Sequence, residues 1–232
     1  MKYLRFNWLI HNVADYCIKE AIESFAKGKM LDIGCGTKPY KKTAEPFVTE
    51  HIGLDHKETL HNKNDIDIFA LADDLPFSDG SYDTVLATSL IEHVEEPNRV
   101  ISEMHRVLKS EGHCIVTTPF MWHLHEEPRD FYRFTKYGLR YLFEKNGFEI
   151  ERLKSIAGFW VTFGQGFVYY IQRFRRGGKL NPLWWIVPFI GMGIQGVCWL
   201  LNRIDHSERF TVTYLVVARK ILIQAQKQLR VF

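Results

Sequence analysis

The sequence lacks a cysteine pattern, an internal repeat and a low-complexity tract. Its four cysteines form no C-x-x-C pair and show no metal-like spacing, which excludes a disulfide scaffold and a cysteine zinc site. Reduced thiols that pack as small apolar side chains in a cytoplasmic protein are expected at Cys17, Cys35, Cys114 and Cys198. The missing repeats exclude solenoid and propeller architectures.

The sequence also lacks a strong charge imbalance and a recognisable signal peptide. Its 30 basic and 27 acidic residues are mixed along the chain and leave a net charge of +3, so no nucleic-acid partner is expected. Lys2 and Arg5 precede an apolar stretch, but charged residues follow at once and no small-residue cleavage site is present. The length of 232 residues predicts a single α/β domain spanning 1–232.

Short apolar runs alternate with helical patterns along the chain. The alternation predicts strands joined by helices, and therefore a parallel sheet. A helix is expected at 3–25, within an N-terminal segment 1–28, and two further helices are expected at 100–108, ended by Gly112, and at 135–147. The expected strands are 30–33, 51–55, 66–71, 84–88, 113–118, 148–153 and 210–219.

A glycine-rich turn follows the first expected strand. In Asp32-Ile33-Gly34-Cys35-Gly36, the missing side chains allow a ligand to approach the backbone closely. The third glycine of a dinucleotide fingerprint is replaced by Pro39, which disfavours nicotinamide binding. Asp55 follows Asp32 by 23 residues, close to the spacing at which an acid reaches ribose hydroxyls. Capping of a turn is the alternative role for Asp55.

Four motifs in order resemble the class I S-adenosylmethionine-dependent methyltransferase family: 31–37, 75–83, 92–94 and 106–109. The resemblance covers about residues 28–153 and the last strand. It implies a Rossmann-like seven-stranded sheet with an antiparallel last strand, and S-adenosylmethionine as cofactor. The implied cofactor residues are Asp32, Gly34, Cys35, Gly36, Asp55, Asp73, Asp74, Leu75 and Ser89. Many relatives carry an acid where Leu71 stands, so the adenine contact would fall to Asp73 or to backbone amides.

The segment 118–135 after the fifth strand is expected to lie over the methyl donor. It resembles a subgroup with the pattern His-Glu-x-Pro-x-Asp-x-Tyr-Arg-Phe-Thr, often associated with surface-glycan assembly. If the acceptor is a hydroxyl, a base is needed to accept its proton, and a histidine side chain can act as that base near neutral pH. The predicted catalytic residues are His123, His125 and Asp130, and the predicted acceptor-binding residues are Glu126, Arg129, Tyr132 and Arg133.

Three alternatives accompany these assignments. Arg129, Asp130 and Arg133 could instead form an ion-pair network that only shapes the loop. His93 is expected to pack or hydrogen-bond within its own helix. A metal site built from His123, His125, Glu126 and Asp130 has suitable ligand types but no established ligand spacing, so no metal is expected.

Residues 154–209 form an apolar insertion before the last strand, in which 156–172 and 183–201 carry no charge. As a helix, the second stretch would be about 28 Å long, close to the thickness of a bilayer core. A single membrane crossing would place the final strand on the opposite side of the membrane from the rest of its sheet. Two crossings would carry the basic residues between the two stretches across the membrane, against the positive-inside tendency. Residues 156–201 are therefore expected to lie on a membrane surface, with Trp160, Trp184, Trp185 and Trp199 as anchors. A soluble lid or a dimer contact is the alternative.

The function expected from these features is O-methylation of a glycan or lipid-linked acceptor, in the cytoplasm or at the inner face of the membrane. The alternatives are C- or N-methylation of a small or isoprenoid substrate and a methyltransferase-like binding protein without catalysis. The fourth strand lacks the Asn/Asp-Pro-Pro-aromatic signature, which disfavours adenine or glutamine N-methylation. The pattern leaves the acceptor and the oligomeric state open.

Overall fold

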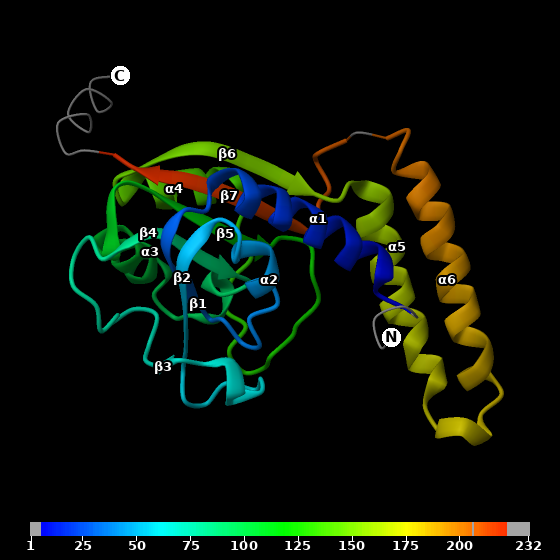
Figure 1. The fold of residues 1–232 in the computed structure, drawn as a ribbon. Coiled ribbons are helices and arrows are strands. Elements are labelled where there is room, and N and C mark those ends of the chain that lie inside the picture. Colours follow the sequence, from blue (N-terminus) through cyan, green and yellow to red (C-terminus); the bar gives the residue numbers. More distant parts are fainter. Residues whose placement is uncertain (1–5, 206, 222–232) are drawn as a thin grey trace. The chain divides into compact units, whose positions relative to one another are not determined.

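The computed structural model describes residues 6–205 and 207–221, so the start of the predicted helix at 3–25 lies outside the described residues. The strands are β1 (Gly28–Ile33), β2 (Val48–Asp55), β3 (Ile68–Phe69), β4 (Tyr82–Thr88), β5 (Leu108–Pro119), β6 (Phe148–Ile156) and β7 (Thr213–Lys220) (Figure 1). The helices are α1 (Trp8–Phe25), α2 (Lys41–Ala44), α3 (Pro97–Val107), α4 (Lys136–Lys145), α5 (Phe159–Gln172) and α6 (Leu183–Leu201).

The chain divides into two compact units. Among the described residues, 18–119, 124–154 and 214–221 form one, called here the sheet unit. Residues 6–17, 120–123, 155–205 and 207–213 form the other, called the helical unit.

The seven strands form one sheet in the order β3-β2-β1-β4-β5-β7-β6. The pairs from β3 to β5 are parallel, and β7 lies antiparallel between β5 and β6. This order confirms the predicted Rossmann-like sheet with an antiparallel last strand. Strand order reverses between β1 and β4, and in open α/β sheets ligands bind beyond the carboxyl ends of the strands at such a point. The glycine-rich turn follows β1 at this position.

Helix α3 carries the predicted apolar stripe. Val100, Ile101, Met104 and Val107 are fully buried, and Pro97 occupies the first turn, where its missing N–H costs nothing. The predicted helix stop at Gly112 is wrong, because the chain enters β5 at Leu108 and Gly112 lies inside that strand. A Cβ at Gly112 would approach the carbonyl oxygens of Lys109 and Asp83 to 2.9 and 3.0 Å. Close backbone approach therefore explains this glycine.

Two other predicted boundaries differ from the structure. The strand expected at 66–71 has only two residues, and the last strand begins at Thr213 instead of residue 210. Thr211, just before β7, is buried and donates its hydroxyl to the carbonyl of Ile156 at 2.8 Å. An apolar pattern marks burial, and burial also occurs in irregular backbone, so the pattern overextends these two strands. It falls short of others, such as β5, which begins five residues before the expected strand at 113–118.

In the helical unit, α5 and α6 pack side by side and run antiparallel (Figure 1). A Cβ at Gly164 would lie 2.3 Å from the sulfur of Cys198, and one at Gly191 would lie 3.5 Å from Val168. Small residues thus allow close packing of the two helices. Trp160 packs against a buried cluster that includes Leu9, Val161 and Cys198, whereas Trp185 and Trp199 are exposed. All four cysteines lie in the described part of the chain as buried thiols outside any disulfide, as predicted.

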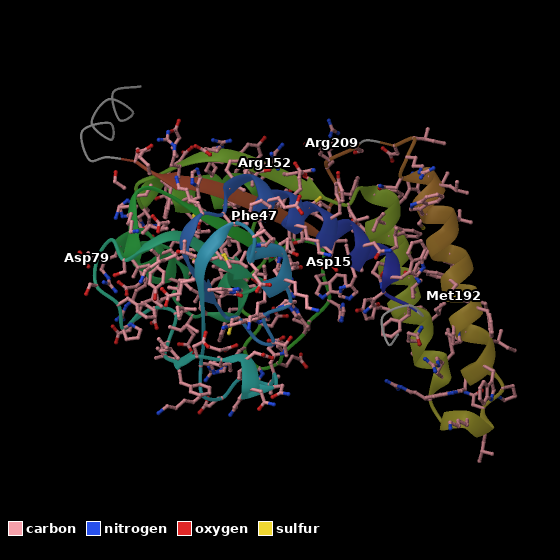
Figure 2. All side chains as sticks on the ribbon, viewed as in Figure 1. Asp15, Phe47, Asp79, Arg152, Met192 and Arg209 are labelled. Carbon is pink, nitrogen blue, oxygen red and sulfur yellow. The ribbon has the colours of Figure 1, made fainter. Side chains whose placement is uncertain are left out.

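The outer faces of α5 and α6 are apolar. By length and composition, helix α6 could cross a membrane. Only 22% of its most apolar 18-residue stretch is buried. The exposed apolar side chains include Phe163, Phe167, Ile186, Phe189, Val197 and Met192, the last labelled in Figure 2. The two helices line an apolar groove of about 460 Å³. Soluble monomers rarely expose contiguous apolar surface of this kind without a partner for it.

Candidate functional site

The glycine-rich turn bends back over the end of β2. The N–H groups of Gly34 and Cys35 donate to the carbonyl of Leu54 at 2.8 and 3.1 Å. Gly34 and Gly36 have φ of +69° and +50°, a region that favours glycine. A Cβ at Gly34 would lie 2.9 Å from Cδ1 of Leu90, so a side chain at this position would have to displace the end of that leucine. The turn therefore presents bare backbone, as the sequence predicts for a close ligand approach.

Asp55 ends β2 beside this turn. Its buried carboxylate accepts hydrogen bonds from the N–H of Gly36 at 3.0 Å and from the N–H of His56 at 2.7 Å. A carboxylate has about four acceptor positions, so further positions remain for a diol. The geometry fits the predicted ribose acceptor and also includes the turn-capping contact that was its alternative.

Two polar pairs beside the turn, one of them with an exposed carboxylate on Asp67, were not predicted from the sequence. Nε2 of His51 lies 3.0 Å from Oδ2 of Asp32, and burial raises the pKa of that carboxyl. The buried ammonium group of Lys38 forms an ion pair with Asp67, which also accepts the N–H of Gly53 at 2.7 Å. These contacts hold the start of the turn against β2. A lysine after a glycine-rich turn normally indicates a solvated charge, so no local signal marks Lys38.

Cys35, a predicted cofactor residue, is inert at neutral pH. Burial raises the pKa of its thiol to about 12, so the thiolate is not populated. Its side chain packs beneath the turn, where a Cβ on Gly53 would approach its sulfur to 2.7 Å. Cys35 can therefore contribute backbone contacts but no nucleophile.

The motif containing Arg106 holds the segment after β3. Its guanidinium donates to the carbonyls of Leu75 and Phe77 at 2.9 and 2.6 Å and to Asp79 at 2.9 Å. The N–H of Leu75 donates to Glu103, so this amide already has a partner. Asp74 pairs with Leu71 in a short bridge, and Asp73 lies 4.0 Å from Arg99. Of the two predicted adenine contacts, an aspartate at this turn fits better than the Leu75 amide.

Beyond β4 and β5, several polar residues of the sheet unit converge. Ser89 has φ of +50°, and its N–H donates to the carbonyl of Thr117 at 3.0 Å. Glu92 follows in a 3-10 turn (η3, Ile91–His93); its carboxyl is fully buried and accepts the hydroxyl of Thr118 at 3.1 Å. Burial raises the pKa of Glu92 to about 8. Sequence reasoning treated Glu92 only as a family signature.

His93 and His125 meet in this cluster. Their rings pack edge to face with centroids 4.6 Å apart. Nδ1 of His93 lies 2.6 Å from the carbonyl oxygen of Arg129, so the prediction that His93 bonds within its own helix is wrong. The error arose because the partner belongs to a loop 36 residues away.

Asp130 orients His125. The backbone N–H of His125 donates to Oδ2 of Asp130 at 3.0 Å, and Nδ1 of its ring lies 3.3 Å from the same oxygen. Arg133 donates to both carboxylate oxygens, which holds the pKa of Asp130 well below its usual range. Asp130 and Arg133 thus form the ion pair that the sequence offered as an alternative to acceptor binding. Arg129 is not part of that pair and instead contacts Glu58 at 2.8 Å.

The remaining predicted acceptor residues lie at different places. Glu126 approaches His61 at 3.6 Å and His93 at 3.9 Å. The hydroxyl of Tyr132 donates to the carbonyl of Glu95 at 2.8 Å. His123 belongs to the helical unit, where its ring lies against Trp122 and Tyr169 with centroids 4.9 and 4.4 Å away. Its catalytic assignment stays a prediction.

Comparison with known proteins points to one family. Residues 31–116 match a family model described as a methyltransferase domain. The chain is 28% identical over 116 residues to malonyl-[acyl-carrier protein] O-methyltransferase of Buchnera aphidicola, which covers 47% of each chain. It is 43% identical over 71 residues to phosphatidylethanolamine N-methyltransferase of Cereibacter sphaeroides, covering 31% of this chain and 32% of the relative. The chain spans about half the length of the curated relatives it matches, or less.

A solved structure extends the likeness over nearly the whole chain. The S-adenosylmethionine-dependent methyltransferase from Mesorhizobium loti superposes with a TM-score of 0.59 at 16% identity, covering 91% of this chain and all of that one. At this identity the likeness shows the fold.

Proposed function

Because the chain belongs to the class I S-adenosylmethionine-dependent methyltransferase family, we propose that it methylates a hydroxyl of a glycan or lipid-linked acceptor. The cofactor supplies an electrophilic methyl group on a sulfonium sulfur. Gly34, Gly36 and Asp55 would hold it, since the turn has bare backbone and a carboxylate in place. A hydroxyl needs groups that orient it and accept its proton. The observation that carries the proposal is the cluster of Glu92, His93 and His125.

Contacts within the sheet unit connect this cluster to the cofactor turn. Leu90, two residues before Glu92, closes over Gly34, and the ring of His61 closes over Gly36. Glu126 then links His61 to His93 at 3.6 and 3.9 Å. The acid and imidazole groups therefore adjoin the backbone that would hold the cofactor. A general base must come within about 2.6–3.2 Å of the hydroxyl that it deprotonates, or act through one water.

The lipid-linked part of the proposal is supported by the helical unit. The exposed apolar faces of α5 and α6 and the basic residues between them have the composition of an element that lies in a membrane interface. Arg173 lies over the ring of Tyr170 at 5.0 Å, and Arg175 over Trp184 at 4.1 Å. Such pairs keep charge next to aromatic groups, as expected at headgroup depth. We propose that the protein is peripheral at the inner face of the membrane.

Methylation of a lipid amine is the second candidate, favoured by the similarity to an enzyme named for phosphatidylethanolamine. Transfer of labelled methyl groups to fractionated cell extract separates these candidates. We expect label in the lipid phase or on lipid-linked glycan, attached as an ether. Label attached to nitrogen would support the second candidate, and label confined to small aqueous products would contradict the lipid-linked acceptor.

We expect Asp55→Ala to weaken S-adenosylmethionine binding by about 10- to 100-fold, because hydrogen bonds to a charged acceptor contribute about 1.5–3 kcal/mol. Calorimetric titration of the folded variant measures the effect. Asp65→Ala, which removes an exposed aspartate of the same unit, is the matched control and should bind as the parent does. Equal affinity in the Asp55 variant would contradict the ribose assignment, and no binding by the parent chain would favour the non-catalytic alternative.

We expect His125→Ala to lower turnover by about 100-fold while S-adenosylmethionine affinity is unchanged, because the proposal assigns the imidazole to the acceptor's proton and Gly34, Gly36 and Asp55 to the cofactor. Asp130→Asn should give a smaller loss, since the residue positions the ring. Single-turnover rates with saturating cofactor provide the measurement. If His125→Ala keeps full activity while His123→Ala does not, the base belongs to His123.

A further inference from the structure

The cluster beyond β4 and β5 has the composition of a metal site. Glu92, His93 and His125 each offer one ligand atom, and these atoms all lie within 4.8 Å of one another. Two imidazoles and a carboxylate are ligands preferred by divalent first-row transition metals. This set differs from the one considered in the sequence, because His123 belongs to the helical unit and Asp130 supports His125.

The two carboxyl oxygens of Glu92 give the strongest support for a cation site at this cluster. Its Oε2 accepts the hydroxyl of Thr118, but its buried Oε1 has no hydrogen-bond partner among the residues that the structure describes. Burial of an oxygen without a partner costs free energy of about 1–3 kcal/mol. The nearest imidazole nitrogen, Nε2 of His93, lies 3.8 Å from Oε1. This distance is too long for a hydrogen bond and suits two ligands of a shared ion.

The orientation of His93 is that of a ligand. Its Nδ1 lies 2.6 Å from the carbonyl oxygen of Arg129, and a carbonyl can only accept, so Nδ1 carries the proton. The neutral ring then has its lone pair on Nε2, which lies 3.8 Å from Glu92 and 3.9 Å from Glu126. Metal-bound histidines commonly donate their other N–H to a backbone carbonyl in this way.

His125 is supported by a carboxylate. Oδ2 of the nearly fully buried Asp130 lies 3.3 Å from Nδ1 of the ring, and Arg133 holds that carboxylate in place. A carboxylate–histidine pair is the other common support of a metal ligand, because it fixes the ring and raises its basicity. An acceptor thus lies near Nδ1 of both histidines, although the guanidinium of Arg133 also approaches Nδ1 of His125 to 3.5 Å.

The spacing of the ligand atoms also fits. Tetrahedral bonds of about 2.0–2.1 Å to zinc place ligand atoms about 3.4 Å apart. Nε2 of His93 and Oε1 of Glu92 are 3.8 Å apart, about half an ångström more than this, and all ligand atoms of the set lie within 4.8 Å of one another. The two imidazole rings would therefore have to draw in when the ion binds. Glu126 and Asp130 bring two carboxylates to the cluster, and Arg133 is the neighbouring cation that pairs with Asp130. The buried carboxyl of Glu92 becomes a third carboxylate when a bound ion displaces its proton.

We propose that Glu92, His93 and His125 bind one divalent first-row metal ion of the zinc type, with Glu126 facing its fourth position. The binding itself is independent of the proposed function. The role we assign to the ion, lowering the pKa of a bound acceptor hydroxyl, rests on that function. In the metal-bound protein the histidines act as ligands, and the loss of turnover expected for His125→Ala then follows from loss of the ion.

Direct metal binding tests the proposal. The purified full-length chain, freed of metal with a chelator, is titrated with Zn²⁺ by calorimetry, and Co²⁺ absorption reports the coordination geometry. We expect one ion per chain and a visible Co²⁺ band typical of tetrahedral coordination. His93→Ala and His125→Ala should each weaken Zn²⁺ binding by at least about 10- to 100-fold, and Asp130→Asn by about 10-fold. Circular dichroism checks the folding of each variant.

His113→Gln is the matched control, because it removes a histidine of the same unit that pairs with Glu151 at 3.1 Å. It should leave Zn²⁺ affinity unchanged. The proposal would be overturned if the parent did not bind one Zn²⁺ per chain. It would also be overturned if folded His93→Ala and His125→Ala each bound Zn²⁺ with the affinity of the parent. S-adenosylmethionine affinity and methyl transfer to extract are measured in parallel on metal-free protein. Methyl transfer without metal binding would leave the proposed function in place and remove the metal, whereas metal binding without methyl transfer would do the reverse.

Discussion

Gly34→Val is expected to abolish measurable S-adenosylmethionine binding. Gly34 has φ of +69°, a conformation that costs a residue with a side chain about 1–2 kcal/mol. The first carbon of that side chain would lie 2.9 Å from Cδ1 of Leu90, so either the leucine side chain or the turn must shift. The added side chain covers the backbone that a ligand would approach, and a shift of the turn also removes the alignment of Gly36 with Asp55. Calorimetry with the folded variant measures the loss.

Gly80→Val separates backbone strain from blocked approach. Gly80 also has a positive φ, +62°, but the nearest atom to an added Cβ is 4.0 Å away. This control should lose stability in thermal unfolding while binding the cofactor normally. If Gly34→Val folds and binds with the affinity of the parent, the turn after β1 is not the cofactor site.

Replacing Arg173, Arg175, Arg176 and Lys179 together by Gln is expected to reduce binding to anionic vesicles by about 100-fold or more. Each basic residue near an anionic surface contributes about 1 kcal/mol, and 1.4 kcal/mol corresponds to a factor of ten. Co-sedimentation with vesicles of phosphatidylcholine, with and without phosphatidylserine, measures the loss. The apolar faces of α5 and α6 remain, so weak binding should persist.

The matched control changes the same charge elsewhere. Lys41, Lys42, Lys57 and Lys136 are exposed in the sheet unit, and their joint replacement by Gln should leave vesicle binding nearly unchanged. Equal losses in both variants would indicate attraction by net charge alone. Absence of vesicle binding by the parent at any lipid composition would favour a soluble lid or a dimer contact for residues 156–201.

Proteolysis distinguishes a surface element from a hairpin that crosses the bilayer. Trypsin cleaves after arginine and lysine, so the basic segment 173–179 is its natural target. In sealed inverted vesicles, where the cytoplasmic face is outside, we expect cleavage of this segment. Protection until detergent is added would instead mean that α5 and α6 cross, as the length and composition of α6 allow.

Several features of the fold could be predicted from the sequence because they are local. The strands of a parallel sheet are buried on both faces and appear as apolar runs, as in β1 and β4. Helix α4 begins where the sequence predicts, because Thr135 caps it: the hydroxyl of Thr135 accepts the N–H of Gly138 at 3.1 Å. Gly112 was misjudged because a glycine after an apolar stripe suits both a helix end and a close strand crossing.

The sequence alone determined the glycine-rich turn proposed to hold the cofactor, because the chemistry of residues 32–36 lies in consecutive backbone groups and needs no distant partner. Only the tertiary structure brought Glu92, His93 and His125 together as a cluster. His125 is 32 positions after His93, and their rings meet because β4 and β5 are neighbours whose carboxyl ends open at the same edge. The pairing of Lys38 with Asp67 has the same origin. Apolar periodicity encodes which side chains are buried, whereas the partners of a buried polar group depend on strand order and register, which form only as the sheet assembles.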